Sequence, residues 1–181
     1  VFLGLEAMID RVLTWRAAAR DRFELDLVAE PLGPAVDEAV ARFRRMLPPD
    51  EVEFEVRSDS HLPVLHDRNG IGILVLNLLT NAYKYTGPDK VISLDLADEE
   101  GHVSIAVKDN GVGVPKREVG RVFDPFYRVE SSQSSASGAG LGLSVVQGVA
   151  HEHEGGVDVV SGPRKGTSFL LYLPASPERP L

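Results

Sequence analysis

The sequence predicts an α/β fold of the α+β type: a two-layer sandwich of helices packed on one mixed β-sheet, preceded by an N-terminal helix. Two observations lead to this prediction. Segments with helical periodicity and segments of alternating polarity are interspersed without a strict β–α–β alternation, which favours a layer of helices over a mixed sheet. The 181 residues, of which 43% are hydrophobic, suffice for one packed domain.

An N-terminal helix is expected over residues 1–20, because apolar side chains recur at three- and four-residue spacing from Phe2 to Trp15. The apolar stripe is narrow, as in a seam for a partner helix, although the helix could instead pack on its own domain. We expect residues 21–174 to form the main domain and residues 175–181 to form a disordered tail.

The main domain is expected to contain six strands and four helices. Strands, in which apolar and polar residues alternate, are expected at 23–27, 52–56, 91–96, 103–107, 157–160 and 167–173. Helices with an apolar face are expected at 33–47, 67–85, 116–122 and 141–151. Helix 67–85 is apolar on most sides and should therefore be buried. The Ser-rich segment 131–137 has no periodicity and should be a mobile loop.

Composition excludes several classes of protein. A net charge of −8 argues against a non-specific nucleic-acid binder. It permits a nucleotide ligand, because backbone N–H groups and a metal ion can bind phosphates. The absence of cysteine excludes a disulfide scaffold and fits a reducing, cytoplasmic compartment. The apolar run Ile71–Leu76 is too short to span a bilayer. Because the chain starts at Val1, we expect it to be part of a longer protein.

The helix expected over 67–85 carries a polar stripe. Four of its residues fall at positions i, i+4, i+7 and i+8 and therefore share one face: Asn77, Asn81, Lys84 and Tyr85. Amide oxygens suit Mg²⁺, a lysine suits a phosphate, and a tyrosine can flank a nucleoside. A solvated stripe would have the same spacing, but asparagines in an apolar helix are costly if they are buried without partners.

A second motif, Asp109–Val114, directly follows an expected strand. A carboxylate at a strand end can accept a hydrogen bond from an exocyclic amine such as that of adenine. Gly111 and Gly113 would let the backbone approach a flat ring closely. Because Asp-Asn-Gly is also strong turn chemistry, a plain turn remains an alternative.

Aromatic and glycine-rich segments flank the Ser-rich loop. Phe123–Arg128 places three aromatic residues on one side, as a local hydrophobic anchor or as the anchor of a lid. Gly138–Ser144 lies where the loop becomes a helix, and exposed N–H groups at a helix N-terminus bind anions. This segment is neither a Walker A motif nor a dinucleotide fingerprint, because no lysine directly follows a glycine. Gly166–Thr167 adds another candidate contact to a phosphate or lid.

Taken together and in this order, the four blocks resemble the N, G1, F and G2 boxes of sensor histidine kinases. The blocks are Asn77–Thr86, Asp109–Gly113, Phe123–Arg128 and Gly138–Leu143. The resemblance extends over most of the chain, from about residue 23 to residue 173. It implies an α/β sandwich that holds ATP between helices and sheet, in the superfamily that also contains gyrase-type topoisomerases, Hsp90 chaperones and MutL proteins.

The resemblance also implies roles for individual residues, with ATP and Mg²⁺ as cofactors. Asn81 would bind Mg²⁺ and, through it, the phosphates, whereas Asp109 would read the adenine amine. The catalytic residues would be Asn77, Asn81 and Lys84. The other nucleotide contacts would come from Tyr85, Gly111, Gly113, Phe123, Arg128, Gly138, Gly140, Leu141, Gly142, Leu143 and Thr167. The ATP lid would extend from about residue 123 to residue 139.

One residue separates the branches of the superfamily. The ATP hydrolases carry a glutamate, acting as general base, where this chain has Asn77, and an amide cannot take a proton. The γ-phosphoryl should therefore pass to a histidine brought from elsewhere, with catalysis by positioning and charge neutralisation. Two alternatives stay open: an ATPase of the gyrase or Hsp90 type, and a non-catalytic regulatory module that acts by protein contact.

The phosphoacceptor of such kinases is a histidine usually followed by an acidic residue and, a few positions later, a proline. None of the five histidines has this context. The segment His151–Glu154 comes closest, but two glycines follow it, and residues i and i+2 of a helix point apart, which disfavours a metal site there. Residues 1–20 resemble the second helix of a dimerisation domain, so the acceptor is expected upstream.

This resemblance also implies partners. We expect the dimerisation and phosphoacceptor helices of the same kinase and a response regulator as partners, and no nucleic acid. The parent protein would be a homodimer with this domain in the cytoplasm, and it could be membrane-anchored.

Overall fold

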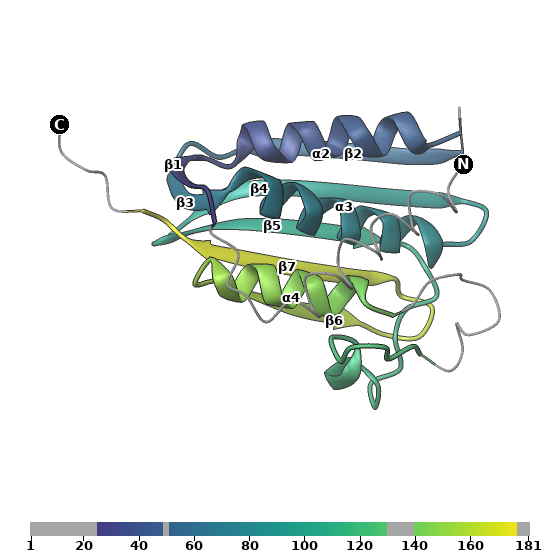
Figure 1. Cartoon of the computed structure of the whole chain (residues 1–181). Helices are drawn as coiled ribbons and strands as arrows, with labels where there is room; N and C mark the ends of the chain where they lie inside the picture. Colours follow the sequence, from purple (N-terminus) through teal and green to yellow (C-terminus); the bar gives the residue numbers. More distant parts are fainter. Residues whose placement is uncertain (1–24, 49–50, 130–139, 177–181) are drawn as a thin grey trace, which may run out of the picture.

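The computed structural model describes residues 25–48, 51–129 and 140–176 (Figure 1). The predictions for the helix 1–20, the Ser-rich loop 131–137 and Gly138 therefore lie outside the described residues. Within the described part there are three helices, α2 (Gly33–Met46), α3 (Arg68–Lys84) and α4 (Gly142–Glu152), and one 3-10 turn, η1 (Val119–Arg121).

Five strands form the main sheet in the order β2-β4-β5-β7-β6. Their bounds are β2 (Val52–Asp59), β4 (Lys90–Glu99), β5 (His102–Asp109), β6 (Gly156–Ser161) and β7 (Thr167–Pro174). The β2–β4 pair is parallel and the other three pairs are antiparallel, so the sheet is mixed. All three helices lie on one face of it (Figure 1). The predicted sandwich of helices on a mixed sheet is thus confirmed.

A second, two-stranded sheet was not predicted. It pairs β1 (Leu27–Pro31) with β3 (Pro63–Asp67) in antiparallel register. The small sheet is an addition to the predicted mixed sheet, and the first described strand begins where the predicted strand 23–27 ends. No sequence pattern indicates β3, because it is only five residues long, starts with a proline and continues directly into α3.

Two other expectations fail locally. The helix expected over 116–122 is only the 3-10 turn η1, which contains Gly120 and whose N-terminal Glu118 makes no side-chain cap. The tail is not disordered at its first two residues. Ala175 N donates to Gly101 O at 3.1 Å and Ser176 N donates to Pro63 O at 2.7 Å, while residues 177–181 lie outside the described part.

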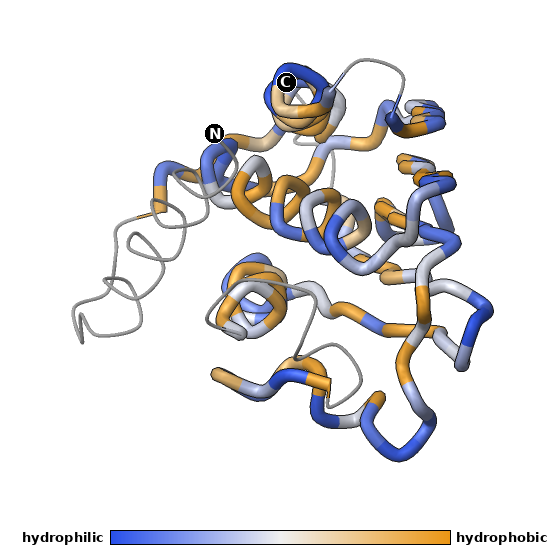
Figure 2. Tube along the Cα trace, turned by 90° about the vertical axis from the view of Figure 1, so that its right-hand side faces the viewer, coloured by the Kyte–Doolittle hydropathy of each residue, from blue (hydrophilic) through white to orange (hydrophobic). Residues whose placement is uncertain are grey.

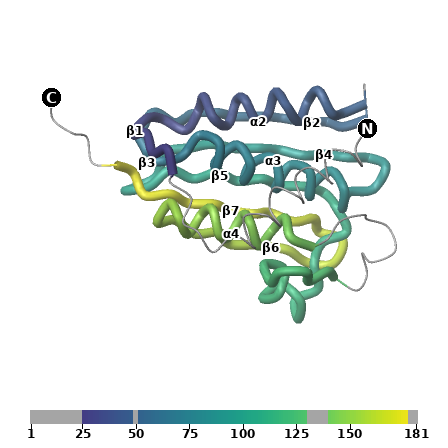
Figure 3. The backbone as a smooth tube through the Cα atoms, viewed as in Figure 1, coloured from purple at the N-terminus to yellow at the C-terminus, as the bar shows by residue number. Residues whose placement is uncertain are grey.

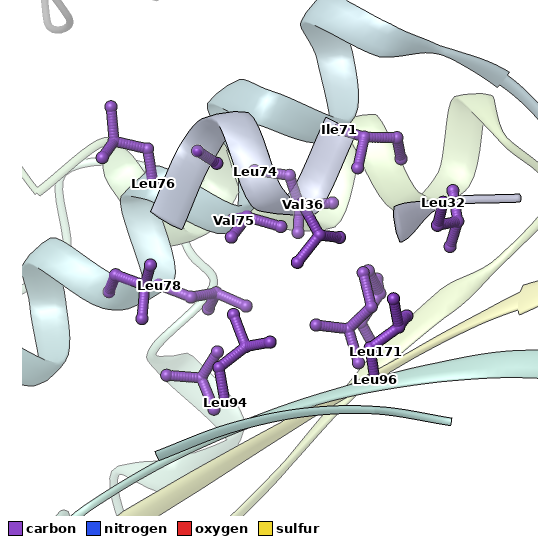
Figure 4. Close-up of a cluster of buried hydrophobic side chains, with 14 of the residues drawn as sticks. Leu32, Val36, Ile71, Leu74, Val75, Leu76, Leu78, Leu94, Leu96 and Leu171 are labelled. Carbon is purple, nitrogen blue, oxygen red and sulfur yellow. The ribbon is translucent and has the colours of Figure 1, made fainter. Parts of the chain in front are cut away.

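Helix α3 is the centre of the core. It lies between α2 and α4, and hydrophobic residues occupy most of its length (Figure 2). In the close-up, Ile71, Leu74 and Leu78 of α3 lie between α2 and the strands β4 and β7 (Figure 4). The buried apolar residues of α3 are Ile71, Leu74, Val75, Leu76, Leu78, Leu79 and Ala82. Each fully buried leucine contributes about 1.5–3 kcal/mol, so this helix is rigidly held.

The start of α3 and the end of α4 are joined at Asp67. The Asp67 carboxylate caps α3 by accepting from Gly70 N at 2.8 Å, and its other oxygen accepts from Asp26 N at 3.0 Å. The Asp67 N–H donates to His153 Nε2, at the end of α4, over 2.9 Å. His153 Nδ1 lies 2.7 Å from Val149 O, so the buried imidazole is a neutral donor–acceptor pair that fixes α4 to the start of α3.

Candidate functional site

The ends of four segments meet at one end of the main sheet. Figure 3 shows the connection between β5 and α4 folding back at the end of the sheet where β5 stops and β7 begins. The last turns of α3 end on the same side, as does the first turn of α4 (Figure 1). The described residues of the four motifs are therefore brought to one place, although the first motif ends at Thr86 and the last begins at Gly138.

An open cavity lies among these segments. Its lining residues are Asn81, Tyr85, Asp109, Val112, Gly113, Val114, Val122, Tyr127, Arg128, Val129, Leu143, Thr167 and Phe169. Most of these side chains are apolar or aromatic, and a few polar groups are set among them, which suits a flat ring with a polar edge.

Asp109 is held at the end of β5 by two backbone donors. Its Oδ1 accepts from Gly111 N at 2.8 Å and from Thr167 N at 3.2 Å. Burial raises the pKa of Asp109 above the ordinary value, and these two hydrogen bonds offset part of that effect. Because both bonds fall on Oδ1, Oδ2 keeps its capacity to accept a hydrogen bond from a ligand in the cavity.

The turn after Asp109 is fastened to the turn between β6 and β7. Gly113 has a φ of 70°, and an added Cβ would lie 1.9 Å from Gly162 O. No other residue type fits this close approach without displacing the backbone. Ser161 supports the same junction, because its Oγ accepts from Val114 N at 2.8 Å and lies 2.9 Å from Thr167 Oγ1.

On α3, Asn81 and Tyr85 line the cavity, whereas Asn77 lies behind its wall. Asn77 is buried, and its Nδ2 donates to Ile73 O at 2.9 Å. A Cβ added at Gly142 would lie 2.9 Å from Asn77 Oδ1, so this amide packs directly against the first turn of α4. Lys84 is half-buried and is not among the lining residues.

The first turn of α4 has no side-chain cap. Its N-terminal Leu141 is buried and Leu143 lines the cavity. The N–H groups of such a turn have no partner within their own helix and can bind an anion. Gly140 precedes this turn, and its carbonyl accepts from Phe126 N at 3.0 Å, which joins the two described ends of the connection.

The aromatic segment forms the remaining wall. Phe123 packs edge-to-face on Phe169 with ring centroids 6.2 Å apart, and Tyr127 and Arg128 line the cavity. The Tyr127 hydroxyl donates to Glu118 Oε2 at 2.8 Å. The Arg121 guanidinium lies 4.2 Å from the centroid of the Tyr127 ring.

The predicted site residues separate into two groups. Those that line the cavity are Asn81, Tyr85, Asp109, Gly113, Arg128, Leu143 and Thr167. Those that lie beside or behind its wall are Asn77, Lys84, Gly111, Phe123, Gly140, Leu141 and Gly142. Sequence reasoning missed Ser161, Glu118 and Tyr127. Only Tyr127 had a signal, because it belongs to the aromatic segment; Ser161 and Glu118 act through contacts that no local pattern reveals.

Two of the histidines are integral to the core. His66 and His153 are buried, and each has a ring nitrogen within 3 Å of a backbone carbonyl. Neither can reach a phosphoryl donor without unfolding its surroundings. In the part of the chain that the structure describes, no group of three acidic or histidine side chains is placed to hold a metal ion.

Comparison with known proteins identifies the family. The sequence profile described as "Histidine kinase-, DNA gyrase B-, and HSP90-like ATPase" matches residues 66–177, which include every described residue of the cavity. The sensor-like histidine kinase SenX3 of Mycobacterium bovis is 36% identical over 143 residues, or 77% of this chain and 34% of its own length.

The chain belongs to the sensor histidine kinases. Solved structures of such kinases have the same fold. The mycobacterial sensor histidine kinase MprB superposes with a TM-score of 0.72 at 32% identity, over 84% of this chain and 99% of that one. The ATP binding domain of PrrB from Mycobacterium tuberculosis gives a TM-score of 0.67 at 26% identity, over 84% and 99%.

This kinase chain spans about a third of the length of the SenX3 relative it matches. In the described ranges, no helix has the length and apolar character needed to cross a membrane.

Proposed function

We propose that this chain is the ATP-binding catalytic domain of its kinase, which donates the γ-phosphoryl of ATP to a histidine other than its own five, for relay to an aspartate of a response regulator. The observation that carries the proposal is Asp109. It lies on the wall of the open cavity, is oriented by Gly111 N and Thr167 N, and keeps an oxygen available. The similar PrrB structure is that of an ATP binding domain, which supports the same ligand here.

Adenine recognition would use both the polar and the apolar sides of the cavity. Asp109 Oδ2 would accept a hydrogen bond from the exocyclic amine. Val112, Val122 and Phe169 would pack on the ring, since all three line the cavity. The combination of one oriented carboxylate and several apolar side chains distinguishes adenine from bases that carry no amine at that edge.

The phosphates would lie toward α4. The uncapped first turn after Leu141 offers N–H donors to them. Asn81 lines the cavity on the opposite helix and could offer an amide oxygen to Mg²⁺. Since no acidic cluster is present among the described residues, the ion would be held by the phosphates and this one amide, a ligand set that Mg²⁺ accepts. Bound there, Mg²⁺ would neutralise phosphate charge.

Asn77 favours transfer over hydrolysis. An amide cannot deprotonate water, and this one is buried and already donates to Ile73 O. The acceptor would be supplied by the dimerisation and phosphoacceptor helices of the same kinase, in a cytoplasmic homodimer that could be membrane-anchored. A gyrase-type ATPase and a regulatory module that no longer binds nucleotide are the rival functions.

The test is calorimetric titration of the chain with ATP and Mg²⁺, followed by incubation with γ-labelled ATP. We expect saturable binding that Asp109→Ala and Asn81→Ala each weaken, no acid-labile label on the chain itself, and no steady release of phosphate. Steady hydrolysis would favour the ATPase. The regulatory module would be favoured if the unaltered chain failed to bind ATP. It would also be favoured if both variants bound ATP as tightly as the unaltered chain.

A further inference from the structure

A buried carboxylate stands behind the aromatic wall of the cavity. Glu118 is 5% exposed, lies just before η1 and belongs to none of the four motifs. Its Oε2 accepts the hydrogen bond of the Tyr127 hydroxyl at 2.8 Å, and Tyr127 lines the cavity. A tyrosine that donates to a buried carboxylate has its ring plane and its hydroxyl fixed together, because the acceptor cannot move into solvent.

A second contact holds the same ring. Arg121, three residues after Glu118, lies with its guanidinium 4.2 Å from the centroid of Tyr127. The backbone carries both groups on one turn, since Arg121 N donates to Glu118 O at 2.9 Å. The charges around the ring are balanced by neighbours: Arg117 Nε lies 3.6 Å from Glu118 Oε1, and Arg121 Nε lies 3.6 Å from Asp124 Oδ2.

The clamped ring lies where the connection joins α4. Phe126 N, one residue before Tyr127, donates to the carbonyl of Gly140, which precedes the first turn of α4. Tyr127 N itself donates to Asp124 O at 3.1 Å. The Tyr127 ring therefore lines the cavity, and its residue lies next to the hydrogen bond that ties the connection to the start of α4.

We infer that Glu118 is a positioning residue for the nucleotide: it holds the Tyr127 ring in place as the wall that closes the cavity on the side of the connection. This inference rests on the proposed binding of Mg·ATP in the cavity. Glu118 acts through Tyr127 and does not touch the nucleotide, and Arg121 supports the ring from its outer side.

The chain contains a matched control for this contact. Tyr83 donates to Glu51 Oε1 at 3.0 Å, and Lys90 Nζ lies 4.8 Å from the Tyr83 ring centroid. The groups are the same, a tyrosine, a carboxylate and a cation over the ring, although Glu51 is exposed whereas Glu118 is buried. Tyr83 is not among the cavity residues, so Tyr83→Phe removes a tyrosine–carboxylate hydrogen bond without altering the wall.

The experiment measures the Kd of Mg·ATP for the chain and for five variants: Glu118→Ala, Glu118→Gln, Tyr127→Phe, the double variant Glu118→Ala with Tyr127→Phe, and Tyr83→Phe. We expect Glu118→Ala and Tyr127→Phe each to raise Kd roughly five- to tenfold, since a hydrogen bond to a charged group is lost. Glu118→Gln keeps an acceptor and should raise Kd only about twofold. Tyr83→Phe should leave Kd unchanged.

The double variant decides whether the two residues act as one unit. If they do, it binds no more weakly than the weaker single variant, because the contact can be lost only once. Additive losses would overturn the inference, as would Kd values unchanged in both Glu118→Gln and Tyr127→Phe. Melting curves without nucleotide show which variants fold. If Glu118→Ala does not fold, the Kd values of Glu118→Gln and Tyr127→Phe still test the inference. Absence of binding by the unaltered chain would instead refute the proposed function.

Discussion

The sheet side of the cavity lies on paired strands, whereas the described part of the connection between β5 and α4 has only turns, and its aromatic ring is held by side-chain contacts. On the sheet side, Asp109 and Thr167 are opposite each other in the β5–β7 register and are tied by main-chain N–H groups. On the connection side, one 3-10 turn is the only regular element in the described part, and Tyr127 depends on contacts to Glu118 and Arg121. We therefore expect the first wall to be as stable as the sheet and the second to be altered more readily without unfolding the domain.

The largest expected effect is on folding, at the sheet wall. Gly113→Ala would place a Cβ 1.9 Å from Gly162 O at a φ of 70°. We expect the free energy of unfolding to fall by about 3 kcal/mol, from backbone strain and displacement of the β6–β7 turn. The control is Gly120→Ala in η1, which has nothing within 4 Å of the added Cβ and should change stability by less than about 1 kcal/mol. Urea unfolding measures the free energy of unfolding of both variants. Equal losses of stability in the two variants would contradict the contrast between the walls.

The next effect is on binding. Asp109→Ala removes the oxygen available to the adenine amine, together with the acceptor of the Gly111 and Thr167 N–H groups. We expect the Kd of ATP to rise roughly 100-fold, because a charge-assisted hydrogen bond in a buried site is lost. Triphosphate without a base provides the control, since its weaker binding should be the same for the variant and the unaltered chain. A change of less than about threefold for ATP would contradict the assigned role of Asp109.

A smaller effect concerns pH. Burial raises the pKa of Asp109 in the folded chain above its ordinary value of 3.8. The folded state thus holds this proton more tightly than the unfolded state, so stability from this group is full below pH 3.8 and is lost as the pH rises through the folded pKa. Asp109→Asn removes the loss. Its free energy of unfolding, relative to the unaltered chain, should rise over this window and then level off; a difference that is independent of pH would contradict the shift.

The smallest expected effect is at the connection wall. Arg121→Ala removes the cation over the Tyr127 ring while the hydrogen bond to Glu118 remains. We expect the Kd of Mg·ATP to rise about twofold and stability to change by less than about 1 kcal/mol. Arg57→Ala, which removes an exposed ion pair with Glu55 on β2, is the control for the lost charge. A larger effect of Arg121→Ala on stability than on binding would show that this wall, too, is part of the folded core.

How far the sequence predicts the residues of the cavity depends on how local their contacts are. Asn81 and Tyr85 could be placed on one face because helical spacing is local, and Asp109 because it follows an alternating strand. Ser161 and Glu118 could not be assigned, because each acts on a residue brought close only by the fold: Val114 in one case and Tyr127 in the other.

The strand β3 was missed for a related reason. Its partner β1 lies more than 30 residues earlier in the chain, and five residues starting with a proline carry too short an alternation to be read. The expected helix at 116–122 failed because apolar spacing alone does not outweigh a glycine within the turn and the lack of a side-chain cap.

The buried imidazole of His153 fixes one end of α4, so a small change in the angle of this helix displaces its other end the most. The end of this helix is hydrogen-bonded to Asp67 through His153. The Asp67 carboxylate also accepts from Asp26 N, and Asp26 lies next to the first described residue of the chain. The first turn of α4 lies at the cavity. Eleven residues of helix span about 16 Å, so a tilt of about 5° about the pinned end displaces the first turn by about 1.4 Å. That is about half the length of a hydrogen bond, so the position at which His153 fixes this end would set the distance between the first turn and a bound phosphate.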